Sequence, residues 1–241
     1  MYQTAFRFHL KLKVHVLCFH GCSSLKKLPD SFIIPSECYR IDSMFKNCTS
    51  LEKLPADFSI HSGITNIGGI ITGCSSLEEL PSGFILPENY SGNLQYFFRD
   101  LDSLKTLPEG FTIPKGVTNL YMMFSGCSSL VSLPDSFSIP ESYSAGVSHM
   151  FYGCKNLEKI PENFIIPVGV TNISFLFASC YKLTGNVTIK GNPETYKQSL
   201  ENTATKSGGT LTVNYSKNCT NIDEILKTGK ASYVVKGEQV D

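Results

Sequence analysis

The chain has 241 residues, with 21 basic and 21 acidic residues, 41% hydrophobic residues and 17% charged residues. This composition is typical of a folded protein, because disordered chains contain fewer apolar residues. We expect neither nucleic-acid binding nor membrane insertion, because the chain has no net positive field and no apolar stretch approaching the ~18 residues of a spanning helix.

The first 21 residues predict an N-terminal strand or cap (1–21). Residues 6–16 alternate apolar and polar side chains, which is the period of a strand with one buried face. Lys11, Lys13 and His15 interrupt the only candidate for the apolar core of a signal peptide. We therefore recognise no signal peptide in this chain.

Residues 22–183 contain about six repeats of 26 or 27 residues, aligned on the sequence Gly-Cys-Ser-Ser-Leu. Leucine recurs three residues after the aligned cysteine, proline seven residues after it and phenylalanine ten residues after it. Such a unit cannot bury its apolar side alone, so neighbouring units are expected to stack into a solenoid with a shared core. The aligned positions, here called the cysteine column, are Cys22, Cys48, Cys74, Leu101, Cys127, Cys154 and Cys180.

Each repeat predicts a short strand on one wall and a short helical or 3₁₀ turn on the opposite wall. Segments such as 32–34 alternate in-out-in with β-favouring residues, and a proline after most of them ends the strand. Segments such as 117–124 place apolar residues at spacings of three and four. The predicted fold class is an α/β repeat solenoid with a parallel sheet along one wall.

Residues 184–241 lack the repeat and predict an α+β cap. A terminal coil would otherwise expose a sheet edge and an apolar cross-section. The predicted strands are 187–190, 211–215 and 233–235, and the predicted helices are 194–205 and 222–227.

The unit Met-Phe-Ser-Gly-Cys-Ser-Ser-Leu-Val-Ser-Leu-Pro at 123–134 resembles the BspA-like leucine-rich repeats of bacterial surface proteins. The resemblance covers roughly residues 15–183. It departs from the family pattern at Leu101 in the cysteine column and at Ile70 and Ile71, where Met-Phe is commoner. The resemblance implies a leucine-rich-repeat-like stack, an extracellular or cell-surface location, and a role in adhesion or recognition.

The cysteines and histidines predict neither a metal site nor a catalytic site. Because Leu101 shares the cysteine column, its cysteines are expected to be free thiols packed inward as small apolar groups. Cys18, His20 and Cys22 offer three ligand types for a metal, but a structural zinc site needs a fourth ligand, and the repeat places both cysteines in core columns. No nucleophile elbow or phosphate-binding loop occurs, so we expect no enzyme, no metal and no cofactor.

Two sets of side chains are candidates for contact with a partner. The outward column of the predicted strands includes Ile33, Ile85, Thr112 and Ile165. The variable segments, which also absorb the extra residue of the 27-residue repeats, carry Tyr96, Tyr121 and Tyr143. A sheet face and amphipathic tyrosines both suit recognition, whereas β-favouring residues exposed singly and tyrosines covering the outer wall are the structural alternatives.

These observations predict a non-enzymatic recognition or adhesion module that binds a protein or glycan, host-derived ligands included, through a repeated solenoid surface. The alternative is a structural assembly component of a surface layer or appendage, in which stacking provides geometry. The sequence identifies neither the ligand nor the oligomeric state.

Overall fold

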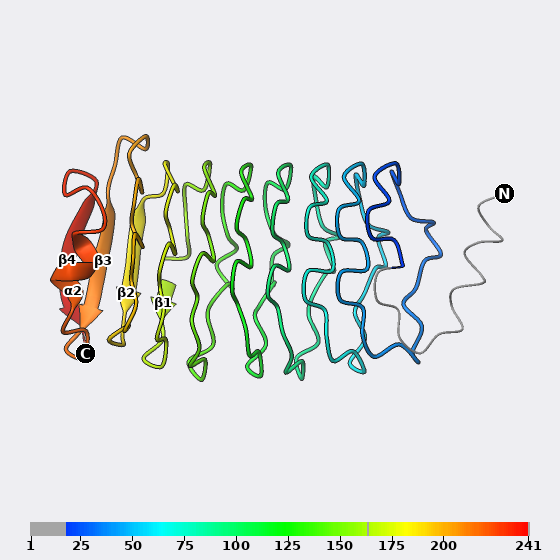
Figure 1. The fold of residues 1–241 in the computed structure, drawn as a ribbon, viewed down its shortest axis with the longest axis horizontal. Coiled ribbons are helices and arrows are strands. Elements are labelled where there is room, and N and C mark those ends of the chain that lie inside the picture. Colours follow the sequence, from blue (N-terminus) through cyan, green and yellow to red (C-terminus); the bar gives the residue numbers. More distant parts are fainter. Residues whose placement is uncertain (1–17, 163, 241) are drawn as a thin grey trace.

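The computed structural model describes residues 18–162 and 164–240, which form an elongated stack of similar coils (Figure 1). The predicted repeat solenoid is confirmed. The strands lie together at the C-terminal end of the stack (Figure 1). The strand or cap predicted for 1–21 falls almost entirely outside the described residues.

Two columns of phenylalanine rings run through the core from coil to coil. In the column three residues before the cysteine column, neighbouring rings stack with centroids 5.0–5.6 Å apart. In the column after the prolines, neighbouring rings stack at 6.1–6.5 Å. The two columns meet edge to face, as at Phe124 and Phe137 (5.6 Å, 73°), so each coil packs against both of its neighbours.

Only the last of the six predicted repeat strands is a strand, β1 (Phe164–Ile166). Earlier coils keep the predicted in-out-in burial, as at 111–113, but parallel pairing in residues 18–162 is limited to isolated bridges such as Lys27 with Lys53. Extended segments form a sheet only where their backbone N–H and C=O groups pair in a continuous ladder. The expectation of a continuous sheet through these coils is therefore wrong.

The wall ahead of the cysteine column is a ladder of turns, so the predicted helical or 3₁₀ wall is also wrong. In residues 41–47 every second N–H group donates to a carbonyl of the next coil at 2.7–3.0 Å. A helix keeps its N–H bonds within its own segment, so it cannot form where half of the donors leave the coil. Successive turns produce the apolar spacing of three and four. The donors are Ile41, Ser43, Phe45 and Asn47, and the acceptors are Asn66, Gly68, Ile70 and Thr72.

The C-terminal segment continues the stack through β2 (Gly185–Ile189), β3 (Leu211–Ser216), α2 (Ile222–Leu226) and β4 (Val234–Val240). The four strands form one parallel sheet in the order β1-β2-β3-β4. These strands overlap the segments predicted at 187–190, 211–215 and 233–235, and α2 overlaps the segment predicted at 222–227.

The helix predicted at 194–205 is wrong, because this segment is a further rung of the ladder. Ile173, Phe175 and Phe177 donate their N–H groups to carbonyls within it at 2.8–2.9 Å. The only helix in residues 18–162 and 164–240 is the five-residue α2, so nothing in this part of the chain has the length of a transmembrane helix.

Candidate interaction surface

From Cys48 onward, the side chains of the cysteine column lie inside the core. In five coils its thiol donates to the carbonyl of the phenylalanine column in the preceding coil at 2.9–3.1 Å. Burial raises the pKa of Cys48 to about 11 and that of Cys74 to about 12, so these thiols stay protonated donors at neutral pH. The donors are Cys48, Cys74, Cys127, Cys154 and Cys180.

None of the nine cysteines, all of which the structure describes, forms a disulfide. Seven of them are buried, Cys18 is half-buried and Cys22 is exposed. The expectation that Cys22 faces the core is therefore corrected. Within the described ranges, no three histidine, cysteine or carboxylate side chains come together as a possible metal site.

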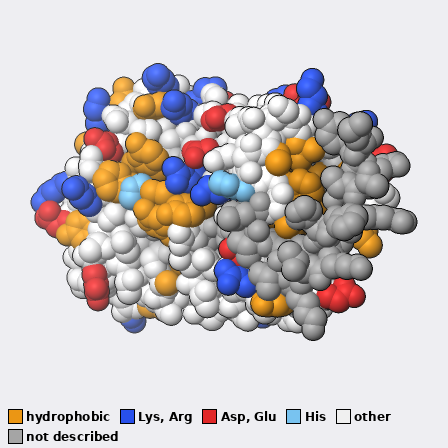
Figure 2. All heavy atoms as spheres, turned by 45° about the vertical axis from the view of Figure 1, so that its right-hand side comes forward, with side chains coloured by type: hydrophobic (Ala, Val, Ile, Leu, Met, Phe, Trp, Pro, Cys, Tyr) orange, Lys and Arg blue, Asp and Glu red, His pale blue; other side chains and the backbone are white. Residues whose placement is uncertain are grey.

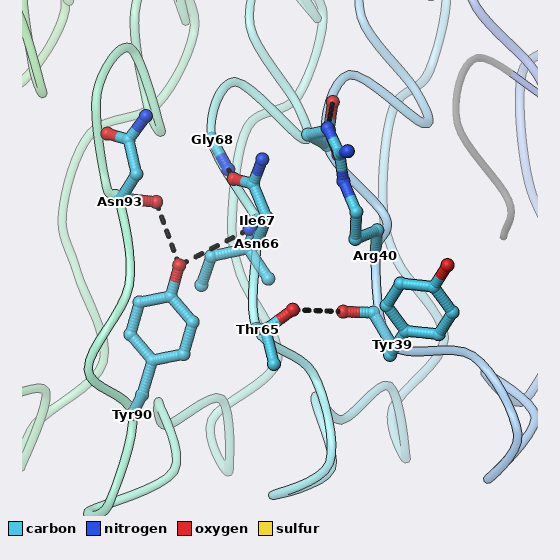
Figure 3. Close-up of polar contacts among 9 residues, drawn as sticks. Tyr39, Arg40, Thr65, Asn66, Ile67, Gly68, Tyr90 and Asn93 are labelled. Carbon is cyan, nitrogen blue, oxygen red and sulfur yellow. Dashed lines mark hydrogen bonds and ion pairs between the residues drawn. The ribbon is translucent and has the colours of Figure 1, made fainter.

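Tyr143, a predicted contact residue, is instead part of the ladder, as is Tyr90 at the same position of an earlier coil. The Tyr90 hydroxyl accepts from the N–H of Ile67 at 3.3 Å and donates to the carbonyl of Asn93 at 2.9 Å (Figure 3). The Tyr143 hydroxyl likewise accepts from Leu120 at 3.1 Å and donates to Gly146 at 2.9 Å. Both tyrosines are only 3% exposed, so Tyr143 does not contribute to the surface.

These two tyrosines lie in the two 27-residue repeats that separate Cys74 from Leu101 and Cys127 from Cys154. In 26-residue repeats the corresponding N–H group donates directly to a carbonyl of the next coil, as from Leu94 to Asn119 at 3.0 Å. The tyrosine hydroxyl therefore bridges the ladder where a coil carries one extra residue.

Tyr96 and Tyr121 remain at the surface, where they begin a line of contacting side chains. Their rings meet edge to face with centroids 5.6 Å apart, and the Tyr121 ring meets that of His149 at 5.8 Å. His149 stacks on Phe175 at 4.5 Å and 19°, and Tyr152 contacts both rings. We define the aromatic row as these five residues together with Met122, which occupies the repeat position equivalent to Tyr96, His149 and Phe175. Figure 2 shows hydrophobic side chains gathered around a histidine on the left half of this face.

The row is partly open to solvent and spans four successive coils. Tyr152 is 42% exposed, and the other five members are half-buried. The guanidinium of Arg99 lies over the Tyr96 ring, 5.3 Å from its centroid, and Nε of Arg99 lies 3.1 Å from the Asp100 carboxylate. At the end marked by Tyr96, the row therefore meets an ion pair, Arg99 with Asp100, whose charges offset each other.

The Ser148 hydroxyl orients His149 at the centre of the row. The Ser148 hydroxyl donates to the carbonyl of Ser174 at 3.0 Å and lies 2.8 Å from Nδ1 of His149. When that hydroxyl donates to the carbonyl, Nδ1–H of His149 donates to the hydroxyl, and Nε2 is then unprotonated in the neutral ring. Burial lowers the pKa of His149, and this favours the neutral ring at neutral pH.

Four members of the row lie on left-handed backbone. Tyr96, Met122, His149 and Phe175 have φ between 54° and 61°. This conformation costs an L-residue about 1–2 kcal/mol relative to right-handed backbone, and glycine adopts it freely. The other left-handed position of the ladder, directly before the cysteine column, holds glycine in four coils, at Gly21, Gly73, Gly126 and Gly153. Bulky side chains therefore occupy the row positions although the backbone conformation there favours glycine.

The predicted strand column is exposed but discontinuous. Ile33 is 72% exposed and Ile85 is 60% exposed, Thr112 is exposed, and Ile165 in β1 is half-buried. Ser59 separates the two isoleucines by one coil. The structure therefore leaves these side chains as single exposures and does not bring them together with the aromatic row.

Sequence reasoning did not identify Met122, His149, Tyr152 or Phe175 as surface contacts. Met122 lies in the segment 117–124, for which the apolar spacing predicts a helical or 3₁₀ turn. The available signal is the column five residues before the cysteine column, which holds large side chains in four successive repeats. Their contact follows from the stacking of equivalent positions in neighbouring coils.

Comparison with known proteins gives matches over most of the chain. The sequence model described as the BspA type leucine rich repeat region matches residues 13–133 and 95–226, with six copies. Among solved structures, a leucine-rich repeat protein from Bacteroides ovatus ATCC 8483 is similar, with 17% identity and a TM-score of 0.27. That similarity covers 92% of this chain and 86% of that chain. A comparison with curated proteins finds no match.

Proposed function

Since the chain belongs to the BspA-type leucine-rich repeat family, we propose that it is a non-enzymatic recognition or adhesion module of the cell surface or extracellular space. It binds a protein or glycan, host-derived ligands included, through side chains repeated along the solenoid. Affinity in such a surface comes from several anchors in neighbouring repeats acting together.

The aromatic row is the observation that carries this proposal. Tyrosine and other aromatic side chains provide large contact areas with few rotatable bonds, and they are enriched at interfaces. Bulky side chains held on unfavourable backbone also point to function, because folding alone would favour glycine there. The row therefore supports binding more strongly than the separate exposures of the strand column do.

A combined array of matrix proteins and glycans tests the proposal. The double variant Tyr96→Ser/Tyr121→Ser should keep the wild-type melting temperature and lose binding to the array member that wild type recognises. Tyr143 is left unchanged because its hydroxyl supports the ladder. Tyr39→Ser is the matched control, because Tyr39 is 45% exposed and lies outside the row. Equal binding by the double variant and the control would contradict a role for the row.

The second candidate is an assembly component of a surface layer or appendage, and the position of β4 favours it. Within the described residues β4 pairs only with β3, so its other edge offers backbone groups to a further strand. Light scattering separates the two candidates, because regular large oligomers support assembly and a monomer that binds an array member supports recognition.

A further inference from the structure

We infer that the aromatic row docks a protein partner through an uncharged, aliphatic face of that partner, in preference to a glycan. This inference rests on the proposed function and names the partner class for the same surface. Four properties of the row support it: its backbone bonding, its ring geometry, its polar groups and its charge.

The backbone of the row is already paired, so a partner cannot dock by adding a strand. The N–H groups of Tyr96, Met122, His149 and Phe175 donate to carbonyls of the next coil at 2.9–3.2 Å. Strand addition requires a free edge of N–H and C=O groups. Contacts with a partner at this surface are therefore made by side chains.

Four of the five ring contacts in the row are tilted or edge to face, at 60–79°. One face of His149 is covered by Phe175 at 4.5 Å, and Tyr121 and Tyr152 stand at 74° and 60° to the His149 ring. A sugar ring stacks best on an open, flat aromatic face, whereas aliphatic side chains fit between rings that meet at angles. The ring geometry therefore favours aliphatic side chains.

The polar groups beside the row are also used internally. The amide of Asn119 donates to the Gln95 side chain at 3.0 Å and accepts from the N–H of Tyr121 at 2.9 Å. The hydroxyl of Ser148 is shared between Ser174 and His149. A glycan binds mainly through hydrogen bonds to its hydroxyl groups, and Asn119 and Ser148 already commit part of their bonding capacity within the protein.

The distribution of charge around the row favours an uncharged partner. Arg99 is offset by Asp100 at one end of the row. The groups in ring contact with His149 are Tyr121 on the preceding coil, Tyr152 on its own coil and Phe175 on the following coil, and none is a carboxylate. A charged partner would lose hydration at the centre of the row without gaining a counter-ion. The mixture of Tyr, Phe and Met flanked by Arg is also typical of protein–protein contacts.

The test introduces one charge at the centre of the row. His149→Lys places a permanent cation there, and His149→Gln is the neutral control on the same left-handed backbone. For the protein that wild type binds on the array, His149→Lys should raise the dissociation constant by about tenfold or more, because binding would bury an unpaired charge. His149→Gln should raise the dissociation constant by a smaller factor, and the wild-type dissociation constant should change little with salt. Melting temperatures verify that both variants are folded.

Other results overturn the inference in distinguishable ways. Binding to a glycan that is lost in Tyr96→Ser/Tyr121→Ser overturns the protein assignment and keeps the proposed function. Protein binding that is equal in wild type and His149→Lys, or that falls steeply with salt, overturns the uncharged contact alone. If wild type binds no protein or glycan, both the proposed function and this inference are rejected.

Discussion

Replacing Tyr90 with phenylalanine removes a single hydroxyl from the ladder and keeps the ring in the core. In wild type this hydroxyl joins the N–H of Ile67 to the carbonyl of Asn93. The two backbone groups belong to neighbouring coils, and the 27-residue repeat leaves them without the direct bond found in shorter repeats. Tyr90→Phe therefore opens the ladder at one rung.

The expected loss of stability follows from the two groups left without a partner. Tyr90 is 3% exposed and Ile67 is fully buried, so water has little access to this rung. An unpaired buried donor or acceptor costs about 1–3 kcal/mol, or about 2–6 kcal/mol for two, and because Asn93 is only half-buried we expect a loss of about 2–4 kcal/mol in the free energy of unfolding. Tyr143→Phe should have a similar effect, because its hydroxyl makes the same two kinds of bond.

Urea unfolding followed by circular dichroism is the appropriate assay, since the chain contains no tryptophan. Tyr39→Phe is the control and should change the free energy by less than about 0.5 kcal/mol, because Tyr39 is 45% exposed. A loss for Tyr90→Phe no larger than that of the control would refute the bridging role of the hydroxyl.

Three further predictions concern the core. A thiol reagent should label Cys22 quickly, Cys18 slowly and the seven buried cysteines only after denaturation without reductant; disulfides found by mass spectrometry would contradict this. The free energy of unfolding should fall as pH rises from 9 towards 12. Burial raises the pKa of Cys74 from 9.0 to about 12, so its stabilising contribution is complete below pH 9 and is lost as pH rises through the folded value; unfolding titrations that stay flat over this window would reject the effect. Leu107→Ala should lower the free energy of unfolding by about 2–5 kcal/mol, since Leu107 is 5% exposed in a core shared with both neighbouring coils; a change below about 0.5 kcal/mol in urea unfolding would reject its burial.

The solenoid could be predicted from the sequence because its columns repeat at a fixed period. The walls were harder to predict, since the apolar spacing in 117–124 fits both a helix and a chain of turns. The direction of the N–H groups separates the two, and that direction depends on the next coil. Most of the predicted strands likewise lack continuous pairing with the next coil, and that pairing cannot be inferred from a single repeat.

The candidate surface could be predicted only in part. Tyr96 and Tyr121 were identified by residue type, and the same reasoning included Tyr143, whose hydroxyl is buried. The occurrence of tyrosine at one position in both 27-residue repeats, Tyr90 and Tyr143, is a signal for its structural role. His149 and Phe175 lie 26 residues apart, so their contact emerges only when the repeats are stacked.

The ladder bonds between successive coils give the solenoid a mechanical property. Neighbouring coils are joined by short hydrogen bonds, four of them in the rung formed by residues 41–47. A force that separates the two ends acts on these junctions in series, so the weakest junction yields first. Each released coil of 26 residues would lengthen the chain by about 90 Å, since an extended residue spans ~3.5 Å. A solenoid that tethers two surfaces would therefore absorb mechanical work by unfolding one coil at a time, while its remaining coils stay folded.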